Sequence, residues 1–309
     1  MSGTIQHNLD IHLHLGAHKT ATTHIQSILR ANRERLLSSS IKLSLPWDVR
    51  KEWLPLFCRY CNRHRQWNST RLINQLVDIA PTRGLWVLSD ENIIGVSKDF
   101  IKKPGIYSMA QDRTACLKSL FPSARIKLFF SIRSYDSFYR SAYCEVARQN
   151  GFFPFEDFFN PKRFANNSWL ELVGRFQDVL PPEDIILWRF EDFQQLLPQV
   201  LQLLTGIDDV GNLIRNYKPK VTQSSFSAKT MERMGALQPM AEREESKKIL
   251  ESLNRAFPLS EKFPPYRPFS VQQEAEFQDQ YAEDVRKIRS NYPQIHFLSP
   301  QRQESETIE

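Results

Sequence analysis

Hydrophobic and polar residues alternate at the start of the chain and then change to a helical period. Leu9, Ile11, Leu13 and Leu15 are separated by polar residues, which is the period of a β-strand. Gly16 interrupts this alternation, and apolar residues then recur at helical spacing over residues 25–36. The segment therefore predicts a strand, a short loop and a helix.

Strands and helices alternate further along the chain. Apolar runs predict strands over residues 85–89, 126–132 and 185–188. Helical spacing predicts helices from about residues 136 and 168, and a third helix that ends near Gly206. This alternation indicates an α/β fold with a mostly parallel central sheet flanked by helices. Sites in such sheets lie beyond the carboxyl ends of the strands.

No strand pattern is recognised after about residue 215. Helices over residues 226–238 and 271–290, joined by a Pro-rich stretch, predict a helical C-terminal cap. We therefore expect a flexible N-terminus over 1–8, one domain over 9–298 and a disordered polar tail over 299–309. Within the domain, the core covers about 9–215 and the helical part covers 216–298.

Charge and hydropathy narrow the class of protein. The 309 residues include 41 Lys and Arg against 35 Asp and Glu, a net charge of +6, which suits an anionic ligand. The basic residues are dispersed, so we expect a small-molecule or carbohydrate partner and no nucleic acid. The sequence has no apolar run of the about 18–20 residues needed to span a bilayer. It also has no signal-peptide pattern. These features predict a cytoplasmic protein of a bacterial type.

The loop after the first strand has the composition of an anion site. His18, Lys19, Thr20, Thr22 and Thr23 stand where the next helix begins, so backbone N–H groups, hydroxyls and one ammonium converge there. A phosphate is the expected guest. The loop is not a Walker A motif, because that motif needs a Gly directly before the Lys and another five residues before it.

A second motif follows the strand over 126–132. Arg133 stands at the strand end, and Ser141 lies eight residues later in the following helix. A second, non-transferred phosphate would need such charge-assisted donors to fix its position.

Together these motifs resemble those of sulfotransferases that use 3′-phosphoadenosine 5′-phosphosulfate (PAPS), with the motif set of carbohydrate sulfotransferases. The family's phosphosulfate loop reads roughly (Pro/His)-Lys-(Ser/Thr)-Gly-Thr-Thr, and its 3′-phosphate site pairs a strand-end Arg with a Ser eight residues later. This chain departs from the loop at Ala21, where we expect a negative φ. The acidic turn Glu191-Asp192 also matches, and we interpret Asp192 as a helix cap. The resemblance covers about residues 9–205.

The resemblance implies a P-loop-NTPase-like sheet, PAPS as co-substrate, 3′,5′-bisphosphoadenosine (PAP) as product, and no metal. The residues implied in donor binding are His18, Lys19, Thr20, Ala21, Thr22, Thr23, Arg133 and Ser141. Lys19 would neutralise the leaving oxygen.

The general base is a His or a Glu in the family. Glu91 follows the strand over 85–89, where the Glu type is found. Burial is expected to raise its pKa, and Lys19 is expected to lower it again. Asp90 and His18 are the alternatives. Catalysis is therefore expected from Lys19 with Glu91 or His18.

Two other functions stay open at this point. A P-loop-type kinase of a small molecule would need Mg²⁺ and a strand-end Asp, for which Asp90 is the candidate. A non-catalytic protein that binds PAP or an anionic glycan would use the same pocket without turnover.

Three further groups have both a structural and a functional interpretation. Cys58, Cys61 and His64 could form a zinc or redox site, and His12 with His14 could hold a metal, but ordinary packing is favoured for both. The basic and aromatic stretch over 53–67 could stack on a sugar or form a packed helix.

Overall fold

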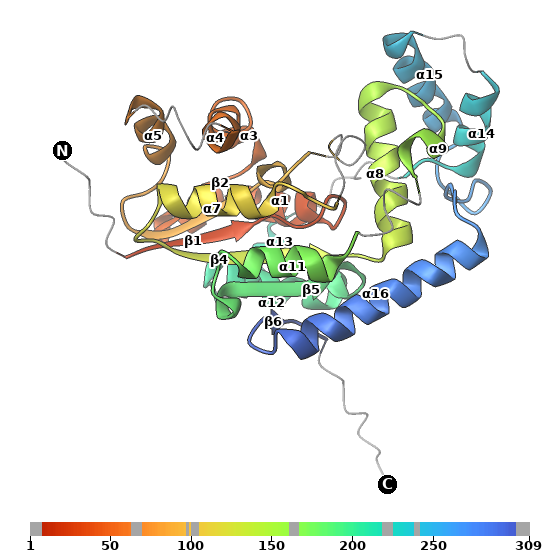
Figure 1. The fold of residues 1–309 in the computed structure, drawn as a ribbon. Coiled ribbons are helices and arrows are strands. Elements are labelled where there is room, and N and C mark those ends of the chain that lie inside the picture. Colours follow the sequence, from red (N-terminus) through yellow and green to blue (C-terminus); the bar gives the residue numbers. More distant parts are fainter. Residues whose placement is uncertain are drawn as a thin grey trace.

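A six-stranded, wholly parallel sheet forms the centre of the protein (Figure 1). The computed structural model describes residues 8–62, 70–96, 99, 105–160, 167–217, 225–237 and 242–300. The strands, in chain order, are β1 Leu9–His14, β2 Ile41–Ser44, β3 Gly84–Ser89, β4 Arg125–Ile132, β5 Ile185–Arg189 and β6 His296–Phe297. Their order across the sheet is β2-β3-β1-β4-β5-β6.

The strand order places the first predicted loop at the middle of one edge. The chain fills one side of β1 with β2 and β3, then crosses to the other side for β4, β5 and β6. His14 at the end of β1 is in register with Ser89 of β3 and Phe129 of β4. The carboxyl ends of these three strands therefore meet at the point where the strand order reverses, which is the usual site position in open α/β sheets.

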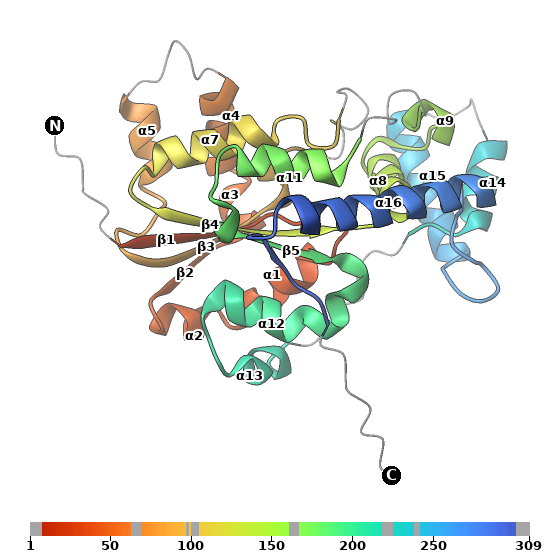
Figure 2. The ribbon, with the colours of Figure 1, turned by 60° about the horizontal axis from the view of Figure 1, so that its bottom comes forward.

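Helices cover both faces of the sheet, and Figure 2 shows the two layers edge-on. One layer begins with α1, the helix that follows the loop carrying Lys19. It comprises α1 Thr22–Ala31, α2 Arg33–Ser38, α12 Phe193–Thr205 and α13 Val210–Arg215. The opposite layer comprises α4 Trp53–Asn62, α5 Thr70–Val77, α7 Ala110–Leu120 and α11 Trp169–Gln177. Short helices connect these elements: α3 Pro46–Val49, η1 Glu91–Ile93, η2 Pro182–Asp184 and η3 Phe190–Asp192. The two layers bury two separate apolar clusters against the sheet.

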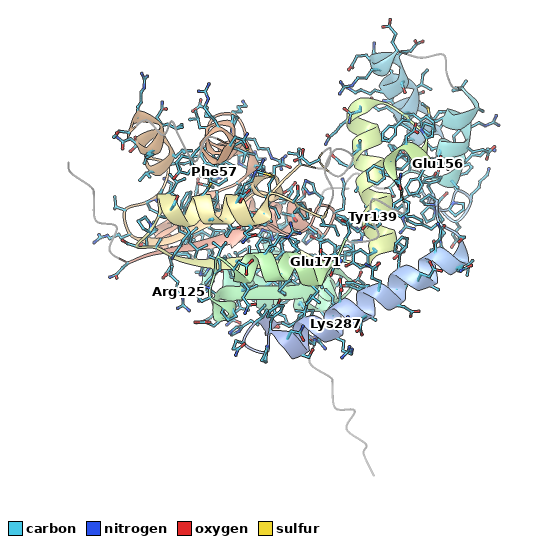
Figure 3. The ribbon with its side chains drawn as sticks, in the orientation of Figure 1. Phe57, Arg125, Tyr139, Glu156, Glu171 and Lys287 are labelled. Carbon is cyan, nitrogen blue, oxygen red and sulfur yellow. The ribbon has the colours of Figure 1, made fainter. Side chains whose placement is uncertain are left out.

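A group of helices extends beyond the carboxyl edge of the sheet (Figure 1). It comprises α8 Tyr135–Asn150, α9 Phe155–Phe158, α14 Ala228–Ala236 and α15 Arg243–Ala256, and α16 Val271–Asn291 leads from it back to the sheet. Aromatic side chains pack this group together: Tyr139 of α8, labelled in Figure 3, contacts Phe159 and Phe277 at ring-centroid distances of 5.3 and 5.8 Å.

The side chain of Asp284 fastens α16 to the core. Asp284 is buried and accepts hydrogen bonds from the Tyr135 hydroxyl, from Ser168 Oγ at 3.0 Å and from the Trp169 N–H at 2.8 Å. The N–H groups at the start of α11 are thus satisfied by a residue more than 100 positions away. This contact joins the C-terminal helix to the helix that follows β4.

The α/β fold class with a parallel sheet flanked by helices is confirmed, and the predicted C-terminal helices are present as α14 and α16. The expectation that strands end before residue 215 is wrong, because β6 pairs with β5 at the edge of the sheet. β2 was also not predicted. Asp192 occupies the N-cap position of α12, but its side chain makes no capping bond, so its predicted role as a cap is wrong.

Among the segments that the structure describes, no helix combines the length and the apolar character needed to cross a bilayer. The predicted N-terminal segment and C-terminal tail fall almost entirely on residues 1–7 and 301–309, which lie outside the described residues. The domain division stays a prediction.

Candidate functional site: an anion cradle at the carboxyl edge of the sheet

Lys19, Glu91 and Arg133 all emerge at the carboxyl edge of the sheet, as the strand pattern predicts. The loop that carries Lys19 begins as a continuation of β1. The Leu15 N–H donates to the Phe129 carbonyl at 3.1 Å, and the Ala17 N–H donates to the Ser131 carbonyl at 3.0 Å. These two bonds hold the loop against the end of β4 and bring it close to Arg133.

The loop backbone has three left-handed residues. Gly16, Lys19 and Ala21 have φ of +57°, +67° and +61°. Loops that contain left-handed residues can bring successive N–H groups together in a concave anion site. Within the described part of the chain, the N–H groups of residues 21–23 have no hydrogen-bond acceptor. They lead into the N-terminus of α1, whose dipole adds to the positive potential.

Ala21 has a left-handed backbone conformation, which Gly adopts without strain. The expected negative φ is wrong, since φ is +61° and ψ is 18° at this position. A left-handed conformation costs an L-residue roughly 1–2 kcal/mol relative to the right-handed one. The shape of the loop is therefore kept at the expense of strain at Ala21.

The threonines have different environments. Thr20 is buried and donates through Oγ1 to the Ala17 carbonyl at 2.6 Å, which braces the loop. Thr22 Oγ1 is buried and has no partner among the described residues, whereas Thr23 is exposed. A Cβ on Gly16 would lie 2.5 Å from Thr22 Oγ1, so only Gly allows Thr22 to pack this closely. Thr23 thus presents an exposed hydroxyl to a ligand, and Thr22 holds a buried hydroxyl that lacks a partner among the described residues.

The imidazole of His18 is fixed from both sides. The His18 backbone N–H donates to the Tyr107 hydroxyl at 2.6 Å, so that hydroxyl in turn donates to His18 Nδ1 at 2.7 Å. Nε2 must then carry the proton, which it donates to Asn92 Oδ1 at 3.2 Å. Burial lowers the pKa of His18, although nearby carboxylates oppose this effect. His18 is consequently held as a neutral imidazole.

Lys19 reaches across to α8. Its Nζ lies 2.6 Å from Oε2 of Glu145, and the two side chains are 31% and 19% exposed. Oε2 of Glu145 also lies 3.3 Å from an Arg148 nitrogen, and Oε1 accepts from Gln149 at 2.8 Å. Sequence analysis did not single out Glu145. The available signal was its position four residues after Ser141, which puts both on one face of α8.

Arg133 joins the two predicted motifs. Its Nη1 donates to the Lys19 carbonyl at 2.5 Å and its Nε donates to Ser137 Oγ at 2.7 Å. The guanidinium also lies over the Phe190 ring, 4.4 Å from the centroid. Burial lowers the pKa of Arg133 to about 10. Among the described residues, Arg133 has no carboxylate within ion-pair distance, and the charges of Glu191 and Asp136 act on this half-buried cation only from a greater distance.

Ser141 lies between Ser137 and Glu145 along α8. These three residues are spaced by four and share one helix face. Ser137 accepts from Arg133 and Glu145 pairs with Lys19, so that face borders the anion loop. Ser141 is half-buried on this face.

The two acidic residues after β3 differ sharply. Asp90 is fully buried and accepts Nε and Nη2 of Arg50 at 2.8 and 2.9 Å, and it caps η1 through the Asn92 N–H. Glu91 is 17% exposed, and its Oε1 lies 3.0 Å from Arg50 Nη2. Burial would raise the pKa of Glu91, but the positive charge of Arg50 and hydrogen bonds to the carboxylate outweigh burial and lower the pKa. Of the two opposing effects expected at Glu91, positive charge therefore prevails, although Arg50 supplies it. Glu91 is an ionised carboxylate at neutral pH.

No protein-family model matches this chain, and no curated protein matches it. Among solved structures it is similar to the crystal structure of a sulfotransferase from Alicyclobacillus acidocaldarius. The identity is 15% and the TM-score is 0.41, and the match covers 79% of this chain and 95% of that chain. At this identity and TM-score, the function has to be argued from the site itself.

The other candidate groups are structural where the structure describes them. His12 Nδ1 bonds the Leu204 carbonyl at 2.7 Å and His14 Nδ1 bonds Ser89 Oγ at 2.8 Å, so the two rings have separate partners. Cys61 hydrogen-bonds Cys116 of α7 and is a free thiol, and His64 lies outside the described residues. Across the described ranges, no group of three or more His, Cys, Asp or Glu could hold a metal ion.

The basic and aromatic stretch is a packed helix as far as it is described. Trp53, Phe57 and Tyr60 are buried, and Trp53 donates through Nε1 to the Leu76 carbonyl at 3.0 Å. These rings are therefore unavailable to stack on a sugar. Residues 63–69 lie outside the described part.

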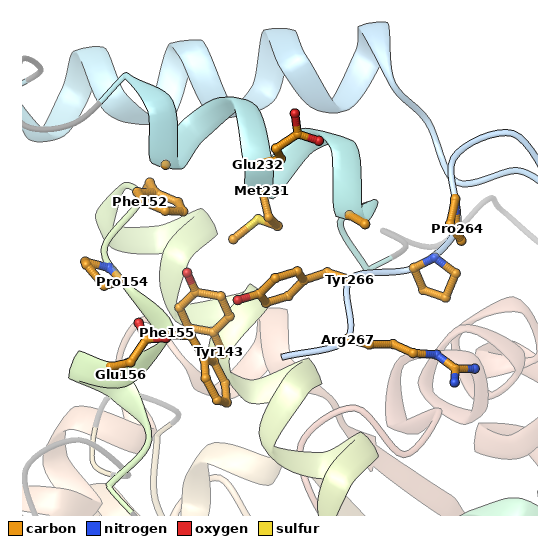
Figure 4. A pocket seen from close by; sticks show the side chains of 13 residues that line it. Tyr143, Phe152, Pro154, Phe155, Glu156, Met231, Glu232, Pro264, Tyr266 and Arg267 are labelled. Carbon is orange, nitrogen blue, oxygen red and sulfur yellow. The ribbon is translucent and has the colours of Figure 1, made fainter. Parts of the chain in front are cut away.

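An aromatic cavity of about 630 Å³ lies on the other side of α8, among α9, α14 and residues 264–267 (Figure 4). Tyr143, Phe155, Met231 and Tyr266 line it, with Glu232 among the polar lining residues. Tyr143 is two residues from both Ser141 and Glu145, which places it on the opposite side of the helix. The cavity is therefore distinct from the anion cradle.

Proposed function

We propose that this protein is a PAPS-dependent sulfotransferase, which transfers a sulfuryl group to a hydroxyl acceptor and releases PAP. The hydrogen bond from Arg133 to the Lys19 carbonyl carries this proposal, because it makes the two predicted phosphate motifs parts of one site. A ligand with two separate phosphates would satisfy both the N–H groups of the loop and the Arg133 guanidinium, which has no carboxylate within ion-pair distance among the described residues.

Donor binding is assigned to residues on both sides of this contact. The 5′ side of the donor would lie on the N–H groups of residues 21–23, with Lys19, Thr22 and Thr23 as side-chain donors. Thr20 and His18 would support the loop from behind, and Ala21 would provide its left-handed turn. The 3′-phosphate would lie between Arg133 and Ser141, where it would also compensate the half-buried guanidinium.

In the reaction, an acceptor oxygen forms a bond to sulfur while the bond from sulfur to the bridging oxygen breaks. PAP leaves with the electrons of that bond, and Lys19 with the loop N–H groups would stabilise the charge on the leaving oxygen. The acceptor proton goes to a base. Glu91 is the best candidate, because it is ionised and partly exposed, whereas Asp90 is enclosed by Arg50 and both His18 nitrogens are engaged.

Asp90 also bears on the kinase alternative. Both Asp90 oxygens accept from Arg50, so this carboxylate is poorly placed to bind Mg²⁺ as a strand-end Asp must. The acceptor class rests on no contact in the structure, and the burial of the aromatic rings of α4 removes one reason to favour a sugar.

The decisive experiment is incubation of the purified protein with labelled PAPS and a panel of sugars, alcohols and phenols. We expect PAP and a sulfated product in equal amounts, detected by mass spectrometry. Calorimetry should also show PAP binding about 10- to 150-fold more tightly than adenosine 5′-phosphate, because only PAP reaches Arg133. PAP binding without product would indicate a binding protein, and a phosphorylated product from ATP would indicate a kinase.

A further inference from the structure

The ammonium group that should meet the donor is already paired with a carboxylate. Lys19 Nζ and Glu145 Oε2 are 2.6 Å apart, and neither side chain is fully exposed, so solvent screens this pair less than a surface ion pair. Lys19 is also one of the left-handed residues that shape the anion loop. The Glu145 carboxylate therefore occupies the position at Lys19 that the charge of an anionic ligand would take.

Glu145 keeps other partners if it loses Lys19. Arg148 and Gln149 lie one turn further along α8, and they contact Oε2 at 3.3 Å and Oε1 at 2.8 Å respectively. The carboxylate can move away from Lys19 without being left unpaired. In the paired state, burial would raise the pKa of Glu145, but the hydrogen bond and positive charge of Lys19, followed by those of Gln149 and Arg148, outweigh burial and lower the pKa.

We propose that Glu145 is an internal counter-ion that competes with anionic ligands for Lys19 and so weakens the binding of anions at this lysine. This inference rests on the proposed function, since it assigns the donor to the same loop. Any anion that uses Lys19 must displace Glu145, which raises the dissociation constants of all such anions by a common factor. A single sulfate or phosphate, which has only the loop, then binds weakly.

A nucleotide with two phosphates can bind in spite of the competition from Glu145. It reaches Arg133 and Ser141 in addition to the loop, and Arg133 lacks a carboxylate partner among the described residues. Glu145 therefore excludes simple anions by occupancy, while the bisphosphate still binds. Glu145 determines specificity in this way without contacting the reacting atoms.

The test compares anion binding by wild type and Glu145→Gln, which removes the charge and keeps the size. Calorimetry should show PAP and inorganic sulfate each binding about 5- to 50-fold more tightly to the variant. This range lies between the effect of losing an exposed ion pair and the effect of losing a hydrogen bond to a charged group. The matched control is Glu232→Gln. Glu232 pairs with Lys229 at 2.7 Å on α14, away from the loop, so its loss should leave both affinities unchanged.

A double-mutant cycle separates this role from a general electrostatic effect. In a Lys19→Ala background, Glu145→Gln should change PAP affinity by less than about 2-fold, because the counter-ion acts only through Lys19. Urea unfolding of each variant shows that the affinities refer to folded protein.

The outcomes are distinct. Unchanged PAP and sulfate affinities in Glu145→Gln, with PAP binding still dependent on Arg133, would overturn the counter-ion and leave the proposed function standing. Unchanged affinities with loss of turnover would make Glu145 a proton acceptor and would also overturn it. If PAP binds neither protein, the proposed function is wrong, and tighter sulfate binding by the variant would still support the counter-ion.

Discussion

Arg50 binds both acidic residues that follow β3, but it encloses only one of them. Its Nε and Nη2 donate to Asp90 at 2.8 and 2.9 Å, and Nη2 also lies 3.0 Å from Glu91 Oε1. Asp90 is fully buried, whereas Glu91 keeps a partly exposed carboxylate. Neighbouring residues of similar chemistry are thus divided into a structural carboxylate and a carboxylate that is available to an acceptor.

This difference between Asp90 and Glu91 predicts different effects when each carboxylate is replaced by its amide. Glu91→Gln should lower kcat by on the order of 10²–10⁴-fold and leave PAP affinity unchanged, because it removes only the proton acceptor. Asp90→Asn should instead lower the free energy of unfolding by about 1–3 kcal/mol, since it weakens the hydrogen bonds that this buried carboxylate accepts from the exposed Arg50 side chain. Steady-state kinetics and urea unfolding on both variants make the comparison. Near-normal turnover of Glu91→Gln would assign the base to another residue.

Arg133→Ala should weaken PAP binding about 10- to 150-fold and change adenosine 5′-phosphate binding much less. Arg133→Lys should recover only part of the loss, because an ammonium lacks the planar fork of a guanidinium. Calorimetry with both nucleotides measures these effects. The control is Arg35→Ala on α2, where the guanidinium pairs at 3.5 Å with Asp209. Equal losses for the two nucleotides would place the 3′-phosphate elsewhere.

Ala21→Gly should raise the free energy of unfolding by about 0.5–1 kcal/mol. Gly removes the cost of the left-handed conformation, and the greater flexibility of Gly in the unfolded chain offsets part of that gain. PAP affinity should be kept, because the loop retains its shape. Ala21→Val should lower both stability and affinity, since a β-branched residue fits a positive φ poorly. Thermal unfolding and calorimetry test the pair, and destabilisation by Gly would contradict the strain at Ala21.

The stability of the protein should fall in mild acid because of His14. Burial lowers the pKa of His14 from 6.5 to about 4, so between these values the unfolded chain binds a proton that the folded protein does not. This one residue should cost about 2 kcal/mol between about pH 7.5 and about pH 5. Urea unfolding of wild type and His14→Gln at both pH values isolates this contribution. The variant should lose less stability than wild type, and identical losses would contradict the neutral buried ring.

Asp284→Asn should lower the free energy of unfolding by about 2–4 kcal/mol. An amide cannot accept all the hydrogen bonds that Tyr135, Ser168 and Trp169 donate to this carboxylate, and its own N–H groups would face donors. Chemical denaturation gives the value. Asp279→Asn on the exposed face of the same helix is the matched control and should have little effect.

Sequence patterns predict the parts of this protein that depend on local order. The strands β1 and β4 have six and eight residues, enough to show a strand pattern, and the positions of Lys19 and Arg133 follow from where those strands end. β2 and β6 have only four and two residues, too few to establish a period. They are strands because neighbouring strands offer them unpaired backbone groups, which is a property of the assembled sheet.

The missed parts of the site are contacts between elements distant in the chain. Arg50, Tyr107 and Glu145 come from three separate segments and meet the predicted residues only after folding. The φ of Ala21 was mispredicted for a related reason. An isolated Ala prefers a negative φ, but the bonds that hold the loop to β4 and the start of α1 fix the backbone around it.

The position of β6 at the sheet edge has a consequence for biosynthesis. β5 pairs with β6 through residues 186–187 and 296–297, and the Leu298 N–H completes the contact at the Leu187 carbonyl. A ribosome must therefore translate more than 100 residues beyond β5, as far as Leu298, before β5 gains its outer neighbour. Until then the nascent chain presents an unpaired apolar strand edge, the kind of surface on which chains associate wrongly and which chaperones shield.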